Sequence, residues 1–134
     1  MVLYEFLEAC DGSFAPPLST KVCISDYADK LSELATHFTI SNNKETIGIC
    51  CCYCNQPEQE IAYISVTCIL PQWQGKGMGK LLTEYVEREV KKIGFQKIRL
   101  EIHKHNYLSL KMHNDFGYVI IKSIDNSHYL QKDL

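Results

Sequence analysis

The chain has 134 residues, of which 46% are hydrophobic, which suffices for a single domain over 1–134 with one core and no disulfide or metal to stabilise it. Its formal net charge of -2 gives no general attraction to nucleic acid or to an anionic membrane, so neither is an expected partner. Residues 1–8 lack the basic start and apolar run of a secretory signal, and the longest apolar run, 47–54, is too short to span a membrane, so we expect a cytoplasmic protein.

Seven cysteines in a chain with no expected leader indicate a reducing compartment, where thiols mostly behave as small hydrophobic side chains. Cys51 and Cys54 form one CxxC spacing, but neither a second such pair nor a His pair follows, as a zinc site requires. We therefore interpret 50–54 as part of a buried strand and expect no metal.

Periodicity predicts a helix and a hairpin in the first third of the chain. The helix is expected from Tyr27 to about Thr36, capped by Ser25-Asp26. Residues 37–41 and 46–54 are mostly β-branched, aromatic or Cys, and they flank the turn-forming segment 42–44. This pattern is typical of two antiparallel strands joined by a turn.

The middle of the chain is predicted to contain a central strand followed by a long helix. After a second expected turn at 55–58, the run 61–70 has bulky side chains on both faces, which favours a strand inside the sheet. Pro71 ends that strand because it has no N–H to donate. Apolar residues then recur at helical spacing from Met78 to Ile93, and Gly94 supplies the stop.

The last third predicts a strand, a short helix and a hairpin. Residues 97–103 alternate as a strand, Asn106 starts a helix that runs to about Asn114, and Gly117 ends it. Residues 118–124 and 128–131 are then expected to be two final strands. This order of elements predicts an α/β fold of the α+β type, with a mixed, mostly antiparallel central sheet flanked by helices.

The turn between the central strand and the long helix is rich in glycine, with Gly75, Gly77 and Gly79 close to Lys76 and Lys80. A strand, a glycine turn and a helix start place unpaired backbone N–H groups and the positive end of the helix dipole at one point. Glycines let the backbone approach an anion closely, and the lysines add positive charge. The turn is therefore a predicted phosphate-binding site.

Two well-known phosphate-binding patterns do not fit this turn. A Walker loop needs a glycine where Gln74 stands and a Ser or Thr where Leu81 stands. A Rossmann pattern would place its third glycine at Lys80 or Leu82.

The spacing that does fit is Gln-x-x-Gly-x-Gly over 74–79, and the segment 71–82 resembles the acetyl-CoA signature of the GNAT acetyltransferase superfamily. The resemblance implies a GNAT-like fold and an N-acetyltransferase that uses acetyl-CoA as co-substrate. In that family the amides of the turn bind the CoA pyrophosphate, and the residues before the turn run beside the pantetheine arm like an added strand. The residues implied here are Cys68, Ile69, Leu70, Gln74, Gly75, Lys76, Gly77, Met78, Gly79 and Lys80.

A second block, 106–118, resembles the family pattern Asn-x-x-Ala-x-x-x-Tyr-x-x-x-Gly-Phe. Asn106 matches the residue that contacts CoA, Ser109 replaces the usual Ala, and Gly117-Tyr118 replaces Gly-Phe. The resemblance thus extends over residues 45–122, with two motifs in the family order.

Acetyl transfer from a thioester to an amine needs a neutral amine, a polarised carbonyl and a proton for the departing thiolate. The resemblance places the oxyanion donor on the backbone near Cys68 or Ile69, where a splayed strand would open the acetyl channel. His113 stands where the family usually carries its proton-donating Tyr. A histidine can donate to a thiolate, but one on a short helix can equally pack or face solvent. Tyr107 is a second candidate for the donor.

The candidate bases are Tyr63 and Glu101, with Glu60, Ser65 and His103 near them on the predicted strands. Each candidate also has a purely structural interpretation, because a tyrosine can be a core aromatic and a glutamate a surface charge. A third alternative, implied by the resemblance, is a base that acts through a relay of water molecules.

The acceptor is expected to be a small amine, such as an amino sugar or an amino acid, with 14–18 and Tyr27 forming the wall of its cleft. Apolar strands near the C-terminus favour a homodimer. A non-catalytic acyl-CoA-binding or sensing module is the alternative function, because the usual Tyr is missing at His113. A nucleic-acid-binding protein is disfavoured, since the lysines of 72–104 alternate with glutamates along a helix.

Overall fold

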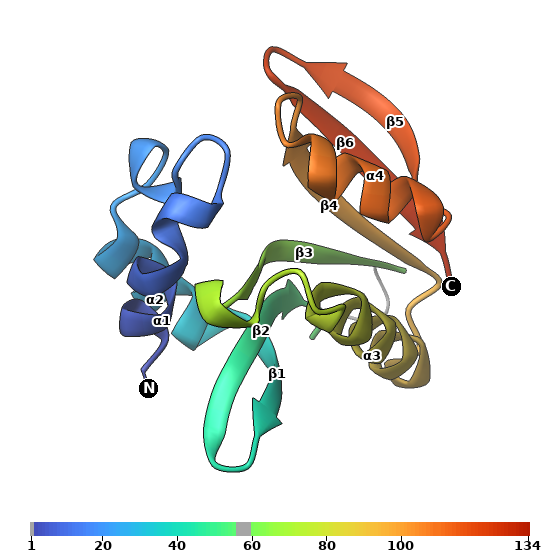
Figure 1. Cartoon of the computed structure of the whole chain (residues 1–134). Helices are drawn as coiled ribbons and strands as arrows, with labels where there is room; N and C mark the ends of the chain where they lie inside the picture. The colour runs from blue at the N-terminus through green and yellow to red at the C-terminus, as the bar shows by residue number, and fades with distance from the viewer. Residues whose placement is uncertain (1, 56–59) are drawn as a thin grey trace.

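The computed structural model describes residues 2–55 and 60–134, and its central feature is a sheet with the strand order β1-β2-β3-β4-β6-β5 (Figure 1). Neighbouring strands are antiparallel except β3 and β4, which are parallel and joined through a helix. The strands are β1 (Thr36–Asn42), β2 (Glu45–Tyr53), β3 (Ile61–Ile69), β4 (Lys97–His103), β5 (Val119–Ile124) and β6 (Ser127–Asp133). The predicted mixed, mostly antiparallel sheet is confirmed.

Four α-helices of the described residues flank this sheet, with short 3-10 turns between them. The α-helices are α1 (Leu3–Cys10), α2 (Ile24–Leu34), α3 (Met78–Ile93) and α4 (Tyr107–Asp115). The 3-10 turns are η1 (Asp11–Ser13), η2 (Leu18–Thr20) and η4 (Pro71–Trp73). None of the described helices has both the length and the apolar character that crossing a membrane requires.

Helix α1 was not predicted, although its sequence contains the signal for it. Leu3, Phe6, Leu7 and Cys10 recur at the spacing of one helix face, and the last three of them are buried. The helix therefore forms because it covers the sheet, and α1 and α2 lie together against one side of it (Figure 1).

The prediction for α2 was wrong at both ends. The helix begins at Ile24, and Cys23 takes the N-cap position in place of the predicted Ser25-Asp26, with no side-chain cap hydrogen bond. It ends at Leu34, because Ala35 is already extended and Thr36 pairs with Cys52 as the first residue of β1. A β-branched residue prefers the strand that follows.

The remaining elements agree with the sequence patterns to within a few residues. The hairpin turns between Asn42 and Glu45, β3 lies inside the sheet between β2 and β4, and Gly94 ends α3 with a positive φ of 120°. The final strand is longer than predicted, because β6 pairs with β4 as far as Asp133. Most of the expected turn at 55–58 lies outside the described residues.

Two hydrophobic clusters hold the helices on opposite faces of the sheet. In the first, Leu82, Val86 and Val90 of α3 are buried against one face of β2, β3 and β4. In the second, Phe6 and Leu7 of α1 pack on the other face. Full burial of each such side chain stabilises the fold by roughly 1.5–3 kcal/mol.

The three cysteines of β2 and the following Cys54 belong to these clusters. Cys50, Cys52 and Cys54 are buried in the α3 cluster, whereas Cys51 is buried in the α1 cluster. The two members of the CxxC spacing therefore contribute to opposite faces of the sheet and are not placed to share one ion. Among the described residues, no group of three His, Cys, Asp or Glu side chains is arranged to hold a metal.

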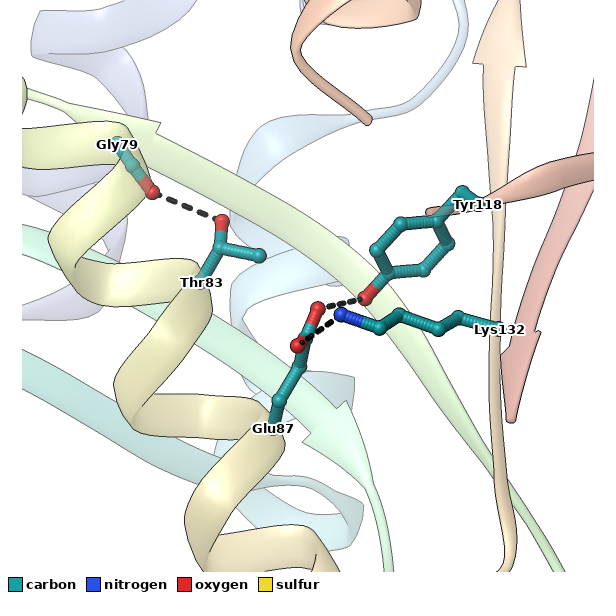
Figure 2. Close-up of polar contacts among 5 residues, drawn as sticks. All are labelled: Gly79, Thr83, Glu87, Tyr118 and Lys132. Carbon is teal, nitrogen blue, oxygen red and sulfur yellow. Dashed lines mark hydrogen bonds and ion pairs between the residues drawn. The ribbon is translucent and has the colours of Figure 1, made fainter. Parts of the chain in front are cut away.

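Glu87 connects α3 to the C-terminal hairpin (Figure 2). Its carboxylate accepts hydrogen bonds from the Tyr118 hydroxyl at 2.8 Å and the Lys132 ammonium at 2.7 Å. One turn earlier on the same helix, the Thr83 hydroxyl donates to the carbonyl of Gly79 at 2.8 Å. The Thr83 bond lies within α3, whereas the two contacts of Glu87 join the helix to Lys132 of β6 and to Tyr118 before β5.

Strand β5 lies at the edge of the sheet and exposes apolar side chains. Val119, Ile120, Ile121 and Ile124 are each at least 40% exposed. Such an edge is a surface on which a second strand can pair. The expected homodimer stays a prediction.

Candidate functional site

The site begins where β3 and β4 separate. Their parallel pairing runs from Ile61 opposite Lys97 to Ile64 opposite Leu100. Beyond that point β3 continues to Ile69 and β4 to His103 without pairing to each other, and the two strands diverge (Figure 1). The predicted splay is therefore present in this sheet.

Two clefts adjoin at the splay. The loop cleft, of about 310 Å³, lies between the N-terminal segment 14–27 and strands β3 and β4. The turn cleft, also of about 310 Å³, lies over the glycine turn 74–79, between β3 and α4. Five residues line both clefts, namely Phe14, Thr67, Asn106, Ser109 and His113. A molecule in one cleft therefore meets a molecule in the other at these residues.

Glycine is required in the turn at two positions. Gly75 has a φ of 73° and Gly77 a φ of 83°, a region that other residues rarely adopt. The first hydrogen bond of α3 runs from the Leu81 N–H to the Gly77 carbonyl. Within the described parts of the chain, no backbone N–H from 75 to 80 finds an acceptor. The turn thus presents a row of free donors at the positive end of α3.

Gln74 has a structural role in this turn. Its amide Nε2 donates to the Ile69 carbonyl at 2.9 Å and contacts the Ser13 hydroxyl at 2.9 Å. The side chain therefore ties the start of the turn to the end of β3 and to the N-terminal segment.

Most of the predicted cofactor-binding residues are brought together along the turn cleft. Its lining includes Cys68, Ile69, Gln74, Gly75, Gly77, Met78, Gly79, Asn106 and Ser109. Leu70 is buried and does not line the cleft, and its N–H donates to the Ile47 carbonyl of β2. Lys76 lies with its ammonium 5.3 Å from the ring centroid of Trp73, and Lys80 is exposed outside the lining.

Helix α4 begins with a side-chain cap. The Oδ1 atom of Asn106 accepts the Ser109 N–H at 3.4 Å, which leaves its Nδ2 group as the free donor beside both clefts. The predicted alternative donor, Tyr107, is 71% exposed and lines neither cleft.

His113 is 7% exposed and is one of the residues that line both clefts. Its Nδ1 is 2.8 Å from the Ser109 carbonyl oxygen, which only accepts, so Nδ1 carries the proton. Burial lowers the pKa of the ring below its ordinary value, opposed by the bond to Ser109 and the charge of Glu87. In the neutral form Nε2 therefore holds a lone pair, and no described residue hydrogen-bonds to it.

Tyr63 and Glu101 both line the loop cleft, but Tyr63 lies in the paired part of β3, opposite Arg99. It stands four residues before Thr67, which is about 13 Å along a strand. Burial, and then the charge of Glu101, raise the pKa of Tyr63, so at neutral pH it is a hydrogen-bond donor. Glu101 lies just beyond the last paired residues and accepts a 3.4 Å hydrogen bond from Tyr129.

Most of the residues expected to form the wall of the acceptor cleft line the loop cleft. Phe14, Pro16, Leu18 and Tyr27 line it opposite β3. The Tyr27 hydroxyl contacts both the carbonyl and the hydroxyl of Ser65, at 3.1 and 2.5 Å, and burial raises its pKa to about 12.

Sequence reasoning missed several residues of the turn cleft. Thr67 stands at the junction, and an apolar wall is made of Trp73, Leu108 and Met112. The i, i+4 spacing of Leu108 and Met112 on α4 was an available signal. Thr67 had none, because its position depends on where β3 and β4 separate.

The comparisons with known proteins agree with this geometry. The model of the Acetyltransferase (GNAT) family matches residues 2–118. No curated protein matches the chain by sequence.

Solved structures share the fold at low sequence identity. An acetyltransferase from Thermus thermophilus has a TM-score of 0.78 and 18% identity, covering 99% of this chain and 89% of that one. The PaiA N-acetyltransferase of Thermoplasma acidophilum, in complex with coenzyme A, has a TM-score of 0.76 and 15% identity, covering 98% and 92%. The ribosomal-protein-S18-alanine N-acetyltransferase of Escherichia coli has a TM-score of 0.75 and 15% identity, covering 95% and 86%. With a family model matched over residues 2–118, the chain belongs to the GNAT acetyltransferase family.

Proposed function

We propose that this protein transfers an acetyl group from acetyl-CoA to the primary amine of a small molecule, by direct attack in a ternary complex. The observation that carries the proposal is the pair of adjoining clefts with five shared residues. Two molecules bound at once would meet at Thr67, Asn106 and His113, without an acyl-enzyme step.

The turn cleft fits the acetyl-CoA co-substrate. Its row of free N–H groups from 75 to 80 matches a pyrophosphate, and the apolar wall opposite β3 suits a pantetheine arm. The Nδ2 group of Asn106 is a further donor at the junction. We assign no direct CoA contact to Leu70, because its N–H is already bonded within the sheet.

The backbone of Ile69 is the proposed oxyanion donor. The Leu70 N–H points to β2, where it bonds to Ile47. Because backbone groups alternate along a strand, the Ile69 N–H faces away from β2, toward the opening left by β4. There it can polarise the thioester carbonyl.

His113 is proposed to move the proton, in a different order from the sequence prediction. Its neutral ring cannot donate from Nε2 at the start, because the proton is on Nδ1. Nε2 is instead free to take the proton of the attacking amine and then to pass it to the departing thiolate. His113 thus serves as base first and as acid second.

Glu101 is favoured over Tyr63 as the residue that binds the ammonium group of the substrate. Its carboxylate lines the loop cleft next to the splay, whereas the raised pKa of Tyr63 leaves that residue a hydrogen-bond donor. Ordered water can carry the first proton of the ammonium to solvent, which leaves a neutral amine whose second proton goes to His113 during the attack.

The test is acetyl transfer itself. Purified protein, acetyl-CoA and a panel of amino sugars, amino acids and polyamines are mixed, and free CoA thiol is followed, with calorimetry for CoA binding. His113→Gln should reduce thiol release at least about 100-fold and leave CoA binding intact, whereas His37→Gln, outside both clefts, should match wild type. CoA binding without release from any amine would instead support the acyl-CoA-sensing module.

A further inference from the structure

We infer that the acceptor amine also carries an anionic group, a carboxylate or a phosphate, which binds between Lys21 and His103 at the loop cleft. The inference rests on the proposed function, because it names the class of molecule that the transferase acts on. It uses residues that take no part in holding CoA.

Lys21 and His103 reach the loop cleft from different parts of the chain. Lys21 follows the η2 turn of the N-terminal segment, and His103 is the last residue of β4, which ends facing that segment (Figure 1). No carboxylate of the described chain lies within ion-pair distance of the Lys21 ammonium. Asp11, which precedes this segment, is held by Ser19, whose N–H and hydroxyl donate to it at 2.8 and 2.7 Å.

His103 is oriented to donate a hydrogen bond. Its Nδ1 accepts the backbone N–H of His105 at 3.1 Å, so the neutral ring carries its proton on Nε2. An anion can therefore bind to Nε2–H whether or not the ring is charged. The His105 ring packs edge-on against the His103 ring, with centroids 5.1 Å apart, and is a third basic group here. Lys21, His103 and His105 together form the basic corner of the loop cleft.

The electrostatics of this corner favour an anion. The pKa of His103 lies below its ordinary value because of partial desolvation, and then because of the positive charges of Lys21 and His105. Glu101 acts in the opposite direction, but less strongly. A bound carboxylate or phosphate would compensate this mutual repulsion of the basic groups.

Glu101 adds a negative charge to the loop cleft, beside the basic Lys21 and His103. It stands two residues before His103 on the same face of β4, about 7 Å away along the strand. The hydrogen bond from Tyr129 draws its carboxylate toward β6. The cleft therefore presents a carboxylate for an ammonium and a basic corner for an anion, which is complementary to a small molecule that carries both.

The experiment compares matched pairs of amines that differ in one anionic group. Alanine is paired with alaninamide, and glucosamine 6-phosphate with glucosamine, so that the two pairs separate carboxylate from phosphate. Binding is measured by calorimetry on protein saturated with CoA, which needs no turnover, and kcat/KM is measured separately with acetyl-CoA. Inorganic phosphate is titrated alongside while the ring resonances of His103 are followed.

In at least one pair the anionic member should bind at least about fivefold more tightly, and the advantage should shrink at high salt. Lys21→Gln should abolish the advantage and the phosphate-induced shift of His103, whereas Lys30→Gln, an exposed lysine of α2 outside both clefts, should keep both. Equal binding within both pairs, no binding of either anionic amine, or an advantage that survives Lys21→Gln overturns the inference. Anion-selective binding without thiol release would support it while refuting the transferase.

Discussion

The hydroxyl of Tyr118 donates a 2.8 Å hydrogen bond to Glu87, thirty-one residues earlier in the chain (Figure 2). Tyr118 also packs edge-on against His113, with ring centroids 5.0 Å apart. Its pKa is raised by burial and by Glu87, so the hydroxyl stays protonated and keeps donating. The contact therefore links the position of the proposed proton carrier to the anchoring of α3.

Removing the cation of this network should destabilise the fold. The side chains of Glu87 and Lys132 are 13% and 26% exposed, so Lys132→Met leaves a mostly buried carboxylate without its counter-ion. We expect a loss of about 2 kcal/mol in the free energy of unfolding, measured with urea at pH 7, and about 1.5 kcal/mol for Tyr118→Phe. Lys97→Met is the matched control, because its pair with Asp133 spans 3.7 Å and is exposed, and it should cost less than about 0.5 kcal/mol. Equal losses for the two lysines would contradict this role of Glu87.

The pH dependence of catalysis should follow His113. Since burial lowers its pKa and the neutral ring is the proposed active form, kcat/KM should rise with pH with a midpoint below the ordinary 6.5. His113→Gln should lack this limb of the profile. A midpoint above 6.5 would show that protonation of His113 is not the cause of the lower activity at low pH.

The same residue should make stability depend on pH. Between its folded and unfolded pKa values, the unfolded chain binds more protons at His113 than the folded protein does. The free energy of unfolding should therefore decrease as the pH falls below about 6.5 and level off below the folded pKa. His113→Gln should show a smaller decrease over this window, measured by urea unfolding at several pH values. An identical decrease in the variant would show that other groups cause it.

Local patterns were sufficient to predict most of the fold. The amphipathic stripe of α3, its stop at Gly94 and the two-faced bulk of β3 each follow from spacing within one segment. Helix α1 carries an equally clear stripe at Leu3, Phe6, Leu7 and Cys10, so its existence also follows from spacing within one segment. The start of α2 at Ile24 was missed because its N-cap, Cys23, is not a usual capping residue.

The site was predictable only where its chemistry lies in consecutive residues. The glycine turn and the Asn106 cap are of that kind. The tautomer of His113 depends on the geometry of its own helix, and the role of Thr67 depends on where two strands separate. Lys21 and His103 line the same cleft only because of how the N-terminal segment packs against β4. Such relations are set by tertiary structure and have no signature in the sequence.

Two glycines of the turn should respond differently to an added methyl group. Gly77 has a φ of 83°, so Gly77→Ala should cost about 1 kcal/mol of stability through backbone strain. At Gly79 a Cβ would lie an ordinary 3.7 Å from the Met112 sulfur, and the position is helical, so Gly79→Ala should fold normally. It lines the turn cleft, however, and should weaken CoA binding at least about tenfold. Thermal unfolding without ligand and calorimetry with CoA separate the two effects. Unchanged CoA affinity in Gly79→Ala would remove this glycine from the proposed binding site.

The reactivity of the cysteines should be controlled by burial rather than by ionisation. All seven are free thiols, of which Cys23 is exposed and the others are buried. A hydrogen bond from Cys52 lowers the pKa of Cys54 to about 6, yet Cys54 is only 3% exposed. We expect a disulfide reagent to modify one thiol rapidly in the native protein and all seven in denaturant, with the rapid phase lost in Cys23→Ser. A rapid phase that persists in that variant would point to Cys54 and show that β2 opens to solvent.

A chelator should leave the unfolding curve unchanged, because Cys51 and Cys54 are buried on opposite faces of the sheet.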